Sequence, residues 1–247
     1  MRPAPFRRVS WPPHKLMRIM IQIVFVVKGQ GEPSREPPLG YRPRQARGVA
    51  AHERVYDTAI AQFAEKGVAA TRVEDIVAAA EVAWGTFYRY FPRKEDVLLE
   101  AAVRQFNDQL LPLVESDLAD PSRSCREKAL RLLVAMLEPG DHPAQLRAEI
   151  IKQVIEQRDR FSAMIGAGEH PLVLLVARIV SQGQERGEVR TDVDRFTLAG
   201  VLLAGTVWPA VYAYGTRSPA SQSASGLQAL VQRVVGILWR GLEPVTG

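Results

Sequence analysis

The segment Trp84–Phe91 combines residue types that suit contact with a nucleic acid. Five of its eight residues are aromatic, although aromatic residues make up only 7% of the chain. Gly85 and Thr86 stand near its start and leave backbone accessible, and Arg89 follows in its middle. A helix with a small, hydroxyl-bearing first turn can meet phosphate with its amides and base edges with its side chains. The segment therefore predicts binding to DNA.

The bulk composition is that of an ordinary soluble protein. The chain has 247 residues, enough for one large domain or two small ones, with 47% apolar and 24% charged residues. Its single cysteine, Cys125, excludes an internal disulfide framework and fits a reducing compartment, so we expect a cytoplasmic protein. Four scattered histidines show no zinc spacing, and we predict no metal and no cofactor.

The positive charge is concentrated at the N-terminus. Residues 1–50 contain ten lysines and arginines against Glu32 and Glu36, whereas the whole chain carries a net charge of +5, so the remainder is net acidic. Residues 1–45 are also rich in proline, and we expect a basic, disordered extension. Such an arm either tracks DNA phosphates or is a solvated tail.

An apolar run within this extension, Leu16–Val27, does not predict a membrane span. It is interrupted by Arg18 and Gln22 and is shorter than the roughly 20 residues that cross a bilayer. A basic stretch precedes it, as in a signal peptide, but no small-residue cleavage pattern follows. The segment is instead interpreted as an accessory extension, or the natural start codon lies downstream of Met1. We expect no membrane partner.

Three short helices are predicted between residues 46 and 92. In the first, Val55, Ala59 and Phe63 recur every four residues and form one apolar face. A cation followed by glycine, Lys66-Gly67, is a typical helix end. The first helix should therefore run from Ala46 to this glycine.

The second and third helices follow as a pair. Thr71 and Glu74 have the spacing of a capping box, which predicts a helix over 73–80 that starts with Thr71 as its cap. Residues 81–83 are long enough only for a turn, and the aromatic segment forms the next helix. Two short helices joined by three residues have the geometry of a helix-turn-helix.

The third helix should have an inner and an outer face. Phe87 and Phe91 lie one turn apart and should anchor it on the first two helices, whereas Gly85, Tyr88 and Arg89 project to the opposite side. A proline after Phe91 then closes the helix.

Several motifs follow one another over residues 54–100 at a fixed spacing without gaps. They are Phe63-Ala64-Glu65-Lys66-Gly67, Ala70-Thr71, Asp75-Ile76-Val77, Gly85-Thr86-Phe87-Tyr88-Arg89-Tyr90-Phe91 and Lys94-Glu95-Asp96-Val97-Leu98. Together they resemble the DNA-binding head of the TetR family of bacterial transcriptional regulators. The resemblance implies an all-α protein with a three-helix helix-turn-helix head over 46–93. It also implies a helical-bundle domain over 94–247 for effector binding and dimerisation.

The resemblance assigns roles to individual residues of the head. Thr71 and Arg72 would contact phosphate at the start of the second helix, and Gly85 and Thr86 would approach the floor of the major groove. The Tyr88 hydroxyl would hold a phosphate. The remaining assigned contacts are Arg89 to a guanine edge or a phosphate, Lys94 to the DNA backbone, and Arg42, Arg44 and Arg47 from the arm.

Three residues depart from the family pattern. Glu81 stands where a glycine is usual, and a left-handed backbone there would cost roughly 1 kcal/mol or more. Ala83 replaces the serine that normally caps the recognition helix, with a loss of about 1 kcal/mol. Trp84 replaces a common lysine or arginine and either touches a thymine methyl or sugar or packs beside the preceding turn. These departures predict a weaker phosphate grip by the recognition helix.

The rest of the chain is expected to be helical, because no alternating strand pattern occurs. We expect a connecting helix over 94–118, bent near Pro112. Further helices are expected over 126–138, 144–165, 172–186, 192–214 and 227–242.

The last two of these helices are unusually apolar, which indicates burial on more than one side. The resemblance implies that they pair with a second copy as a four-helix bundle, and a two-fold dimer would match a palindromic operator. A core within one chain is the alternative. The family also holds a small effector among the body helices, and the sparse charge there favours an apolar one. Its candidate lining, or ordinary core, consists of Met136, Phe161, Met164, Trp208 and Tyr212.

We expect no enzyme activity. The chain lacks glycine-rich phosphate loops, paired metal ligands on helices and nucleophile motifs. The preferred reading is a ligand-responsive repressor that binds double-stranded operator DNA as a homodimer. The alternative is a helical protein-interaction module that has lost operator binding through Glu81, Ala83 and Trp84.

Overall fold

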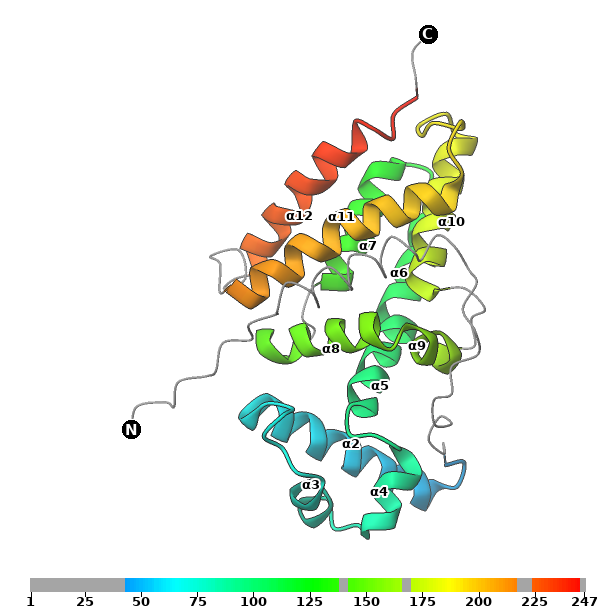
Figure 1. The fold of residues 1–247 in the computed structure, drawn as a ribbon. Coiled ribbons are helices and arrows are strands. Elements are labelled where there is room, and N and C mark those ends of the chain that lie inside the picture. The colour runs from blue at the N-terminus through cyan, green and yellow to red at the C-terminus, as the bar shows by residue number, and fades with distance from the viewer. Residues whose placement is uncertain (1–42, 138–141, 166–169, 217–223, 245–247) are drawn as a thin grey trace. The chain divides into compact units, whose positions relative to one another are not determined.

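The computed structural model describes residues 43–137, 142–165, 170–216 and 224–244, and within them all regular structure is helical (Figure 1). The extension predicted over residues 1–45 lies almost entirely outside these residues. The helices are α2 (Ala46–Lys66), α3 (Val73–Ala79), α4 (Trp84–Tyr90), α5 (Asp96–Gln105), the π-helix η1 (Phe106–Leu110), α6 (Leu111–Ala119), α7 (Cys125–Leu137), α8 (Ala144–Glu156), α9 (Arg158–Ile165), α10 (Pro171–Glu185), α11 (Arg195–Thr216) and α12 (Ala224–Trp239).

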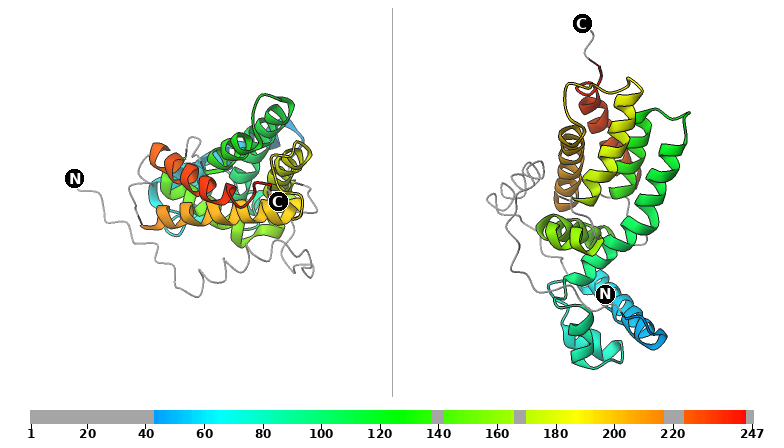
Figure 2. Two further views of the ribbon diagram at one scale, coloured as in Figure 1. Left: turned by 90° about the horizontal axis from the view of Figure 1, so that it is seen from above. Right: turned by 90° about the vertical axis from the view of Figure 1, so that its right-hand side faces the viewer.

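The chain forms two compact units. The head unit comprises the described residues of 30–115 and 139–172, and the bundle unit comprises those of 116–138 and 173–247. The head unit therefore contains the expected three-helix head, 46–93, together with α5, η1, α8 and α9 (Figure 2). The bundle unit contains α7, α11, α12 and most of α10.

Helix α2 follows the predicted apolar pattern. Val55, Ala59 and Phe63 are buried on one face, as their spacing predicted. The helix ends at Gly67, whose φ of 82° lies in the left-handed region and whose amide donates to the Phe63 carbonyl. Both its start and its end agree with the prediction.

The predicted capping box at the start of α3 is wrong. Arg72, not Thr71, occupies the cap position, and no side chain caps the helix. The Thr71 hydroxyl instead donates to the carbonyls of Gly67 and Gln62, at 2.9 and 3.3 Å. The turn after α2 folds its threonine inward, so this side chain closes the turn rather than the helix.

The connecting helix is interrupted before Pro112, close to where a bend was predicted. The α-helical pattern of α5 changes to a π-helix over Phe106–Leu110, and α6 then continues the segment. Proline has no amide hydrogen, so the regular backbone ladder cannot pass through this position unchanged.

The single helix predicted over 144–165 is two helices. The break lies at Gln157, where φ is −117° and ψ is 41°. It turns α9 so that Phe161 and Arg160 are both buried. Contacts with α5 and its preceding loop, described below, hold Gln157 and Arg160 in these positions, and local sequence pattern gives no sign of them.

The bundle unit is built on the packing of α11 against α12. Helix α11 starts at Arg195 rather than at Asp192, because the Asp194 carboxylate accepts the amides of Phe196 and Thr197, both at 3.0 Å. A Cβ on Gly205 of α11 would lie 2.4 Å from a methyl carbon of Leu238, so the two helices touch closely at this glycine.

None of the helices in the described part of the chain is long and apolar enough to span a membrane.

Candidate nucleic-acid interface

The turn between α3 and α4 keeps a left-handed backbone at Glu81, the case for which the sequence indicated a cost. Glu81 has a φ of 52°, the only positive φ among the described non-glycine residues. The amide of Glu81 donates to the Ala78 carbonyl and the amide of Val82 to the Val77 carbonyl, at 3.3 and 3.1 Å. These hydrogen bonds close the turn around Glu81, although a left-handed backbone costs free energy at a residue with a Cβ atom.

Replacing Glu81 with glycine should raise the free energy of unfolding by about 1 kcal/mol, because glycine adopts this backbone without the Cβ clash. Urea unfolding of the two chains measures the difference. Glu74→Gly is the matched control: Glu74 is exposed in helix α3, where glycine should cost about 1 kcal/mol. A destabilised Glu81→Gly chain would contradict the expectation.

Helix α4 is anchored through its inner face. Phe87 and Phe91 are 0% and 2% exposed, which confirms both as anchors. Tyr90, which the sequence analysis assigned no role, is also buried, and its hydroxyl donates to the Gly48 carbonyl of α2 at 3.2 Å. This bond places the C-terminal end of α4 beside the first turn of α2.

The outer face of α4 carries the predicted contact residues. Gly85, Tyr88 and Arg89 are exposed, Thr86 is half-buried, and Trp84 leaves 45% of its surface open. Ala83 occupies the cap position without a side-chain hydrogen bond, as its methyl group requires. The head thus presents a short helix whose inner face is buried against the protein and whose outer face is exposed to solvent.

Two of the predicted phosphate contacts are used inside the protein. Thr71 is only 1% exposed and its hydroxyl is already donated, so its side chain has no surface to offer a phosphate. Lys94 is half-buried, and its ammonium group donates to the carbonyls of Val68 and Thr71, at 2.6 and 2.9 Å. Both side chains instead fasten the loop between α2 and α3.

Arg44, Arg47 and Arg72 are exposed cations of the head. Arg44 and Arg47 flank the start of α2, next to Gly48, which Tyr90 ties to α4. Arg72 stands at the cap position of α3. Positive charge therefore lies at the starts of two of the three head helices.

Comparison with known proteins decides the family. A family model for bacterial regulatory proteins of the tetR family matches residues 55–101. The HTH-type transcriptional repressor KstR2 of Mycobacterium tuberculosis is 28% identical over 191 residues, 75% of this chain and 92% of that protein. The chain belongs to the TetR family. A fatty acid metabolism regulator protein of Bacillus subtilis is 27% identical over 158 residues, 62% of this chain and 77% of that protein.

Solved TetR-family structures share the fold. Thermus thermophilus FadR, a repressor in complex with lauroyl-CoA, superposes with a TM-score of 0.61 at 23% identity, covering 77% of this chain and 94% of that one. Bacillus subtilis FadR in complex with stearoyl-CoA gives 0.57 at 22% identity, covering 78% and 100%. The all-helical architecture with an N-terminal helix-turn-helix head is thus that of TetR-family regulators, which bind DNA.

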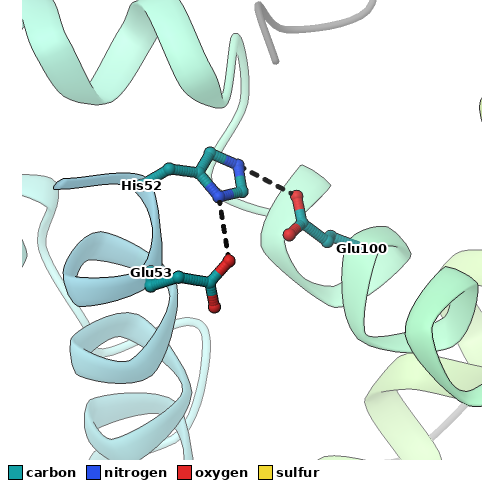
Figure 3. A group of neighbouring side chains, drawn as sticks. All are labelled: His52, Glu53 and Glu100. Carbon is teal, nitrogen blue, oxygen red and sulfur yellow. Dashed lines mark ion pairs between the residues drawn. The ribbon is translucent and has the colours of Figure 1, made fainter. Parts of the chain in front are cut away.

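An ionic cluster, which no sequence pattern predicted, joins α2 to α5 in this TetR-family head unit (Figure 3). The Nε2 atom of buried His52 lies 3.2 Å from a carboxylate oxygen of Glu100, and its Nδ1 atom lies 3.7 Å from Glu53. Arg104 donates to both carboxylates at 2.7–2.9 Å. Only the spacing of Glu100 and Arg104, one helical turn apart, was visible in the sequence.

The cluster has the donor set of a metal site, but a cation of the protein already lies between its carboxylates. Atoms of His52, Glu53 and Glu100 that could ligate an ion all lie within 4.8 Å of one another. The Arg104 guanidinium supplies the positive charge that an ion would bring. Burial alone would raise the pKa of Glu100, but hydrogen bonds from His52 and Arg104 outweigh it and lower that pKa. We therefore interpret the cluster as an ionic clasp between the two helices.

A second set of polar contacts fixes the loop that follows α4. The Asp96 carboxylate accepts the amide of Arg93 at 3.0 Å and pairs with Arg160 of α9 at 2.7 Å. Asp96 and Arg160 are each 4% exposed. The Arg93 guanidinium donates to the Gln157 side chain at 3.2 Å. The chain leaving α4 is thereby tied to α8 and α9.

The five residues predicted to line an effector pocket fall in both units. In the head unit, Phe161 is buried with its ring edge-on to Phe106, 6.5 Å between centroids, and Met164 is half-buried. In the bundle unit, Met136 and Trp208 are half-buried, whereas the side chain of Tyr212 lies outside the described ones. A cavity of about 360 Å³ beside the ionic cluster is lined by none of the five.

Proposed function

We propose that this protein is a ligand-responsive repressor that binds a palindromic operator as a homodimer and acts in the cytoplasm. The observation that carries the proposal is the outer face of α4, open to solvent over a buried aromatic anchor within a TetR-family head. A recognition helix needs both features, because its outer face must enter the major groove while its inner face stays packed against the rest of the head. The relatives named above are transcriptional regulators, and their names describe no enzyme activity.

The head would contact DNA in two ways. Exposed arginines and the Tyr88 hydroxyl would hold phosphates, while the first turn of α4 would face base edges. Thr71 would act by shaping the loop before α3, and Lys94, with two of its three donors on that loop, would offer the remaining one. The residues proposed to contact DNA are Arg44, Arg47, Arg72, Ala83, Trp84, Gly85, Thr86, Tyr88, Arg89 and Lys94, with Thr71 in a supporting position.

A second copy of the chain would pair through α11 and α12. Along α12, a buried stripe faces the bundle unit, but Ile237 is 73% exposed and Val201 of α11 is 44% exposed. Leu230 and Val234 lie on the same side of α12 as Ile237 and are half-buried. An apolar second face on a terminal helix suits burial against its own copy.

A small apolar effector would release the repressor from DNA. Around Phe161 the surroundings are aromatic, and burial lowers the pKa of the neighbouring His170 to about 4, aided by the charge of Arg158, which keeps its imidazole neutral. The His170 Nδ1 atom is buried without a hydrogen-bond partner among the described residues, so a ligand could satisfy it. The two FadR structures hold lauroyl-CoA and stearoyl-CoA, whose acyl chains are apolar although their coenzyme A part is charged, and these chains support an effector with an apolar portion. Effector binding would favour a head spacing that does not fit the operator.

Gly85→Ala tests DNA binding by this face. A Cβ on Gly85 would meet no atom within 4 Å, so nothing in the protein requires a glycine there. The variant should be as stable as the parent or more stable by about 0.5–1 kcal/mol. If the backbone of Gly85 approaches the groove floor, affinity for duplexes that the parent selects from a random pool should fall roughly tenfold or more, a change of about 1.4 kcal/mol. Thermal unfolding and gel shifts at fixed salt give the two readouts.

Ala78→Gly, at an exposed position of α3, is the control for small changes in the head. It should lower stability and leave the affinity of the folded protein unchanged. Two results would contradict the proposal: a parent chain that selects no sequence even at low salt, or a Gly85→Ala variant with unchanged affinity. The first of these would instead support the helical protein-interaction module.

A further inference from the structure

Trp84 is a large apolar side chain in an exposed position of the head. Its ring packs against Tyr88, one turn further along α4, with 5.4 Å between centroids and 54° between the ring planes. Even so, 45% of its surface stays open to solvent. A tryptophan with this much exposed surface lowers solubility and adds little to the stability of the core. Its exposure therefore indicates contact with a binding partner.

The orientation of this indole is supported from the core outwards. Tyr88 contacts Phe87 edge-on at 5.4 Å, and Phe87 contacts Phe91 at 5.8 Å. Both phenylalanines are buried. A continuous row of rings therefore runs from the interior to Trp84, and the indole meets an incoming surface already positioned.

The chemistry of the indole selects one feature of the major groove. Its ring is apolar, and its single N–H can donate but not accept. Among the groups that base pairs display in the major groove, the thymine 5-methyl is the apolar one. Gly85, next to Trp84, has no side chain to hold the groove floor away.

We propose that Trp84 recognises the 5-methyl group of a thymine in each operator half-site, with Tyr88 holding the indole in place. This inference rests on the proposed function and adds the base feature that is recognised. It develops one of the alternatives that the sequence left open, since the indole contacts the Tyr88 ring and keeps 45% of its surface exposed. A lysine or arginine at this position would favour phosphate or guanine instead.

The test removes single methyl groups from the DNA. Duplexes selected from a random pool by the full-length chain are resynthesised with each thymine in turn, in both half-sites, replaced by deoxyuridine. Deoxyuridine keeps every hydrogen-bonding group of thymine. The parent should bind about fourfold more weakly per methyl group removed at one position, the value expected for one buried methyl. Trp84→Ala should bind the thymine and deoxyuridine duplexes equally.

Two further variants separate the indole from its surroundings. Tyr88→Phe keeps the supporting ring but loses the hydroxyl, so overall affinity should fall while the thymine-to-deoxyuridine ratio persists. Val49→Ala, which removes another exposed apolar side chain of the head, should change neither quantity. Circular dichroism melts confirm that each variant is folded.

The outcomes distinguish this inference from the function on which it rests. A parent chain that selects sites but tolerates every deoxyuridine overturns the inference alone. A Trp84→Ala variant that remains as sensitive to deoxyuridine as the parent also overturns it. The same holds if Trp84→Ala binds all duplexes more weakly while the parent shows no methyl-dependent position. A chain that selects no site overturns the proposed function and the inference with it.

Discussion

Arg160→Met is expected to lower the free energy of unfolding by about 3–5 kcal/mol, because it leaves a buried carboxylate without its cation. Asp96 and Arg160 are each 4% exposed, and their charged atoms lie 2.7 Å apart. Among the described residues, the second carboxylate oxygen, Oδ1, is buried without a hydrogen-bond partner, so Arg160 provides most of the compensation. Urea unfolding followed by circular dichroism measures the loss.

The double variant Asp96→Leu/Arg160→Met should recover most of that loss, since an apolar pair of similar volume has no charge to desolvate. Asp192→Asn is the control, because the Asp192 side chain of this ion pair is exposed and its loss should change stability by much less. A double variant as unstable as Arg160→Met would show that packing, not the unpaired charge, sets the cost.

The pair also positions the proposed interface. The Asp96 carboxylate accepts a hydrogen bond from the amide of Arg93, three residues after the end of α4, so it fixes the chain that leaves the recognition helix. Gel shifts of the folded Arg160→Met variant should therefore show a weaker complex as well. In the double variant, DNA affinity should recover less than stability, because the bond to the Arg93 amide is not restored.

Ile237→Glu is expected to convert the proposed dimer into monomers. Ile237 is 73% exposed in the single chain, so a glutamate there leaves the fold of the chain intact. In a dimer, the same carboxylate would be buried in an apolar interface without a partner. The free energy needed to desolvate it would exceed the free energy gained when the helices of the two copies pack together. Analytical ultracentrifugation at micromolar concentration reads the result directly.

Operator affinity should fall with the dimer, because two linked heads bind a palindrome far more tightly than one, by roughly a hundredfold or more. Gln232→Glu is the matched control: it adds the same charge to α12, but five residues earlier and so on another side of the helix. An Ile237→Glu chain that sediments as a dimer would place the interface elsewhere.

Elements that depend on neighbouring residues were predicted well. The bounds of α2, its end at Gly67 and the end of α10 before Gly187 follow from glycines at positive φ and from apolar spacing within a few turns. The buried Phe87 and Phe91 were also predicted, because a short apolar face leaves few alternatives.

Features that depend on residues distant in the sequence were not predicted. The hydroxyl of Thr71 had two possible partners, an amide ahead and a carbonyl behind, and the fold of the turn chose the carbonyl. The break at Gln157 follows from contacts with Arg93 and Asp96, about sixty residues earlier. The clasp of His52 to Glu100 likewise joins helices whose pairing no local pattern specifies.

By itself, the sequence determined most of the helices, the helix-turn-helix and the main residues on each face of α4, because backbone geometry and side-chain periodicity act over a few residues. Only the tertiary structure decided which polar groups are consumed inside the protein. It turned Thr71 and Lys94 towards the loop before α3 and left Trp84 and Tyr88 open to solvent. The physical reason is that a polar side chain bonds to whichever partner the packing of distant helices brings within reach.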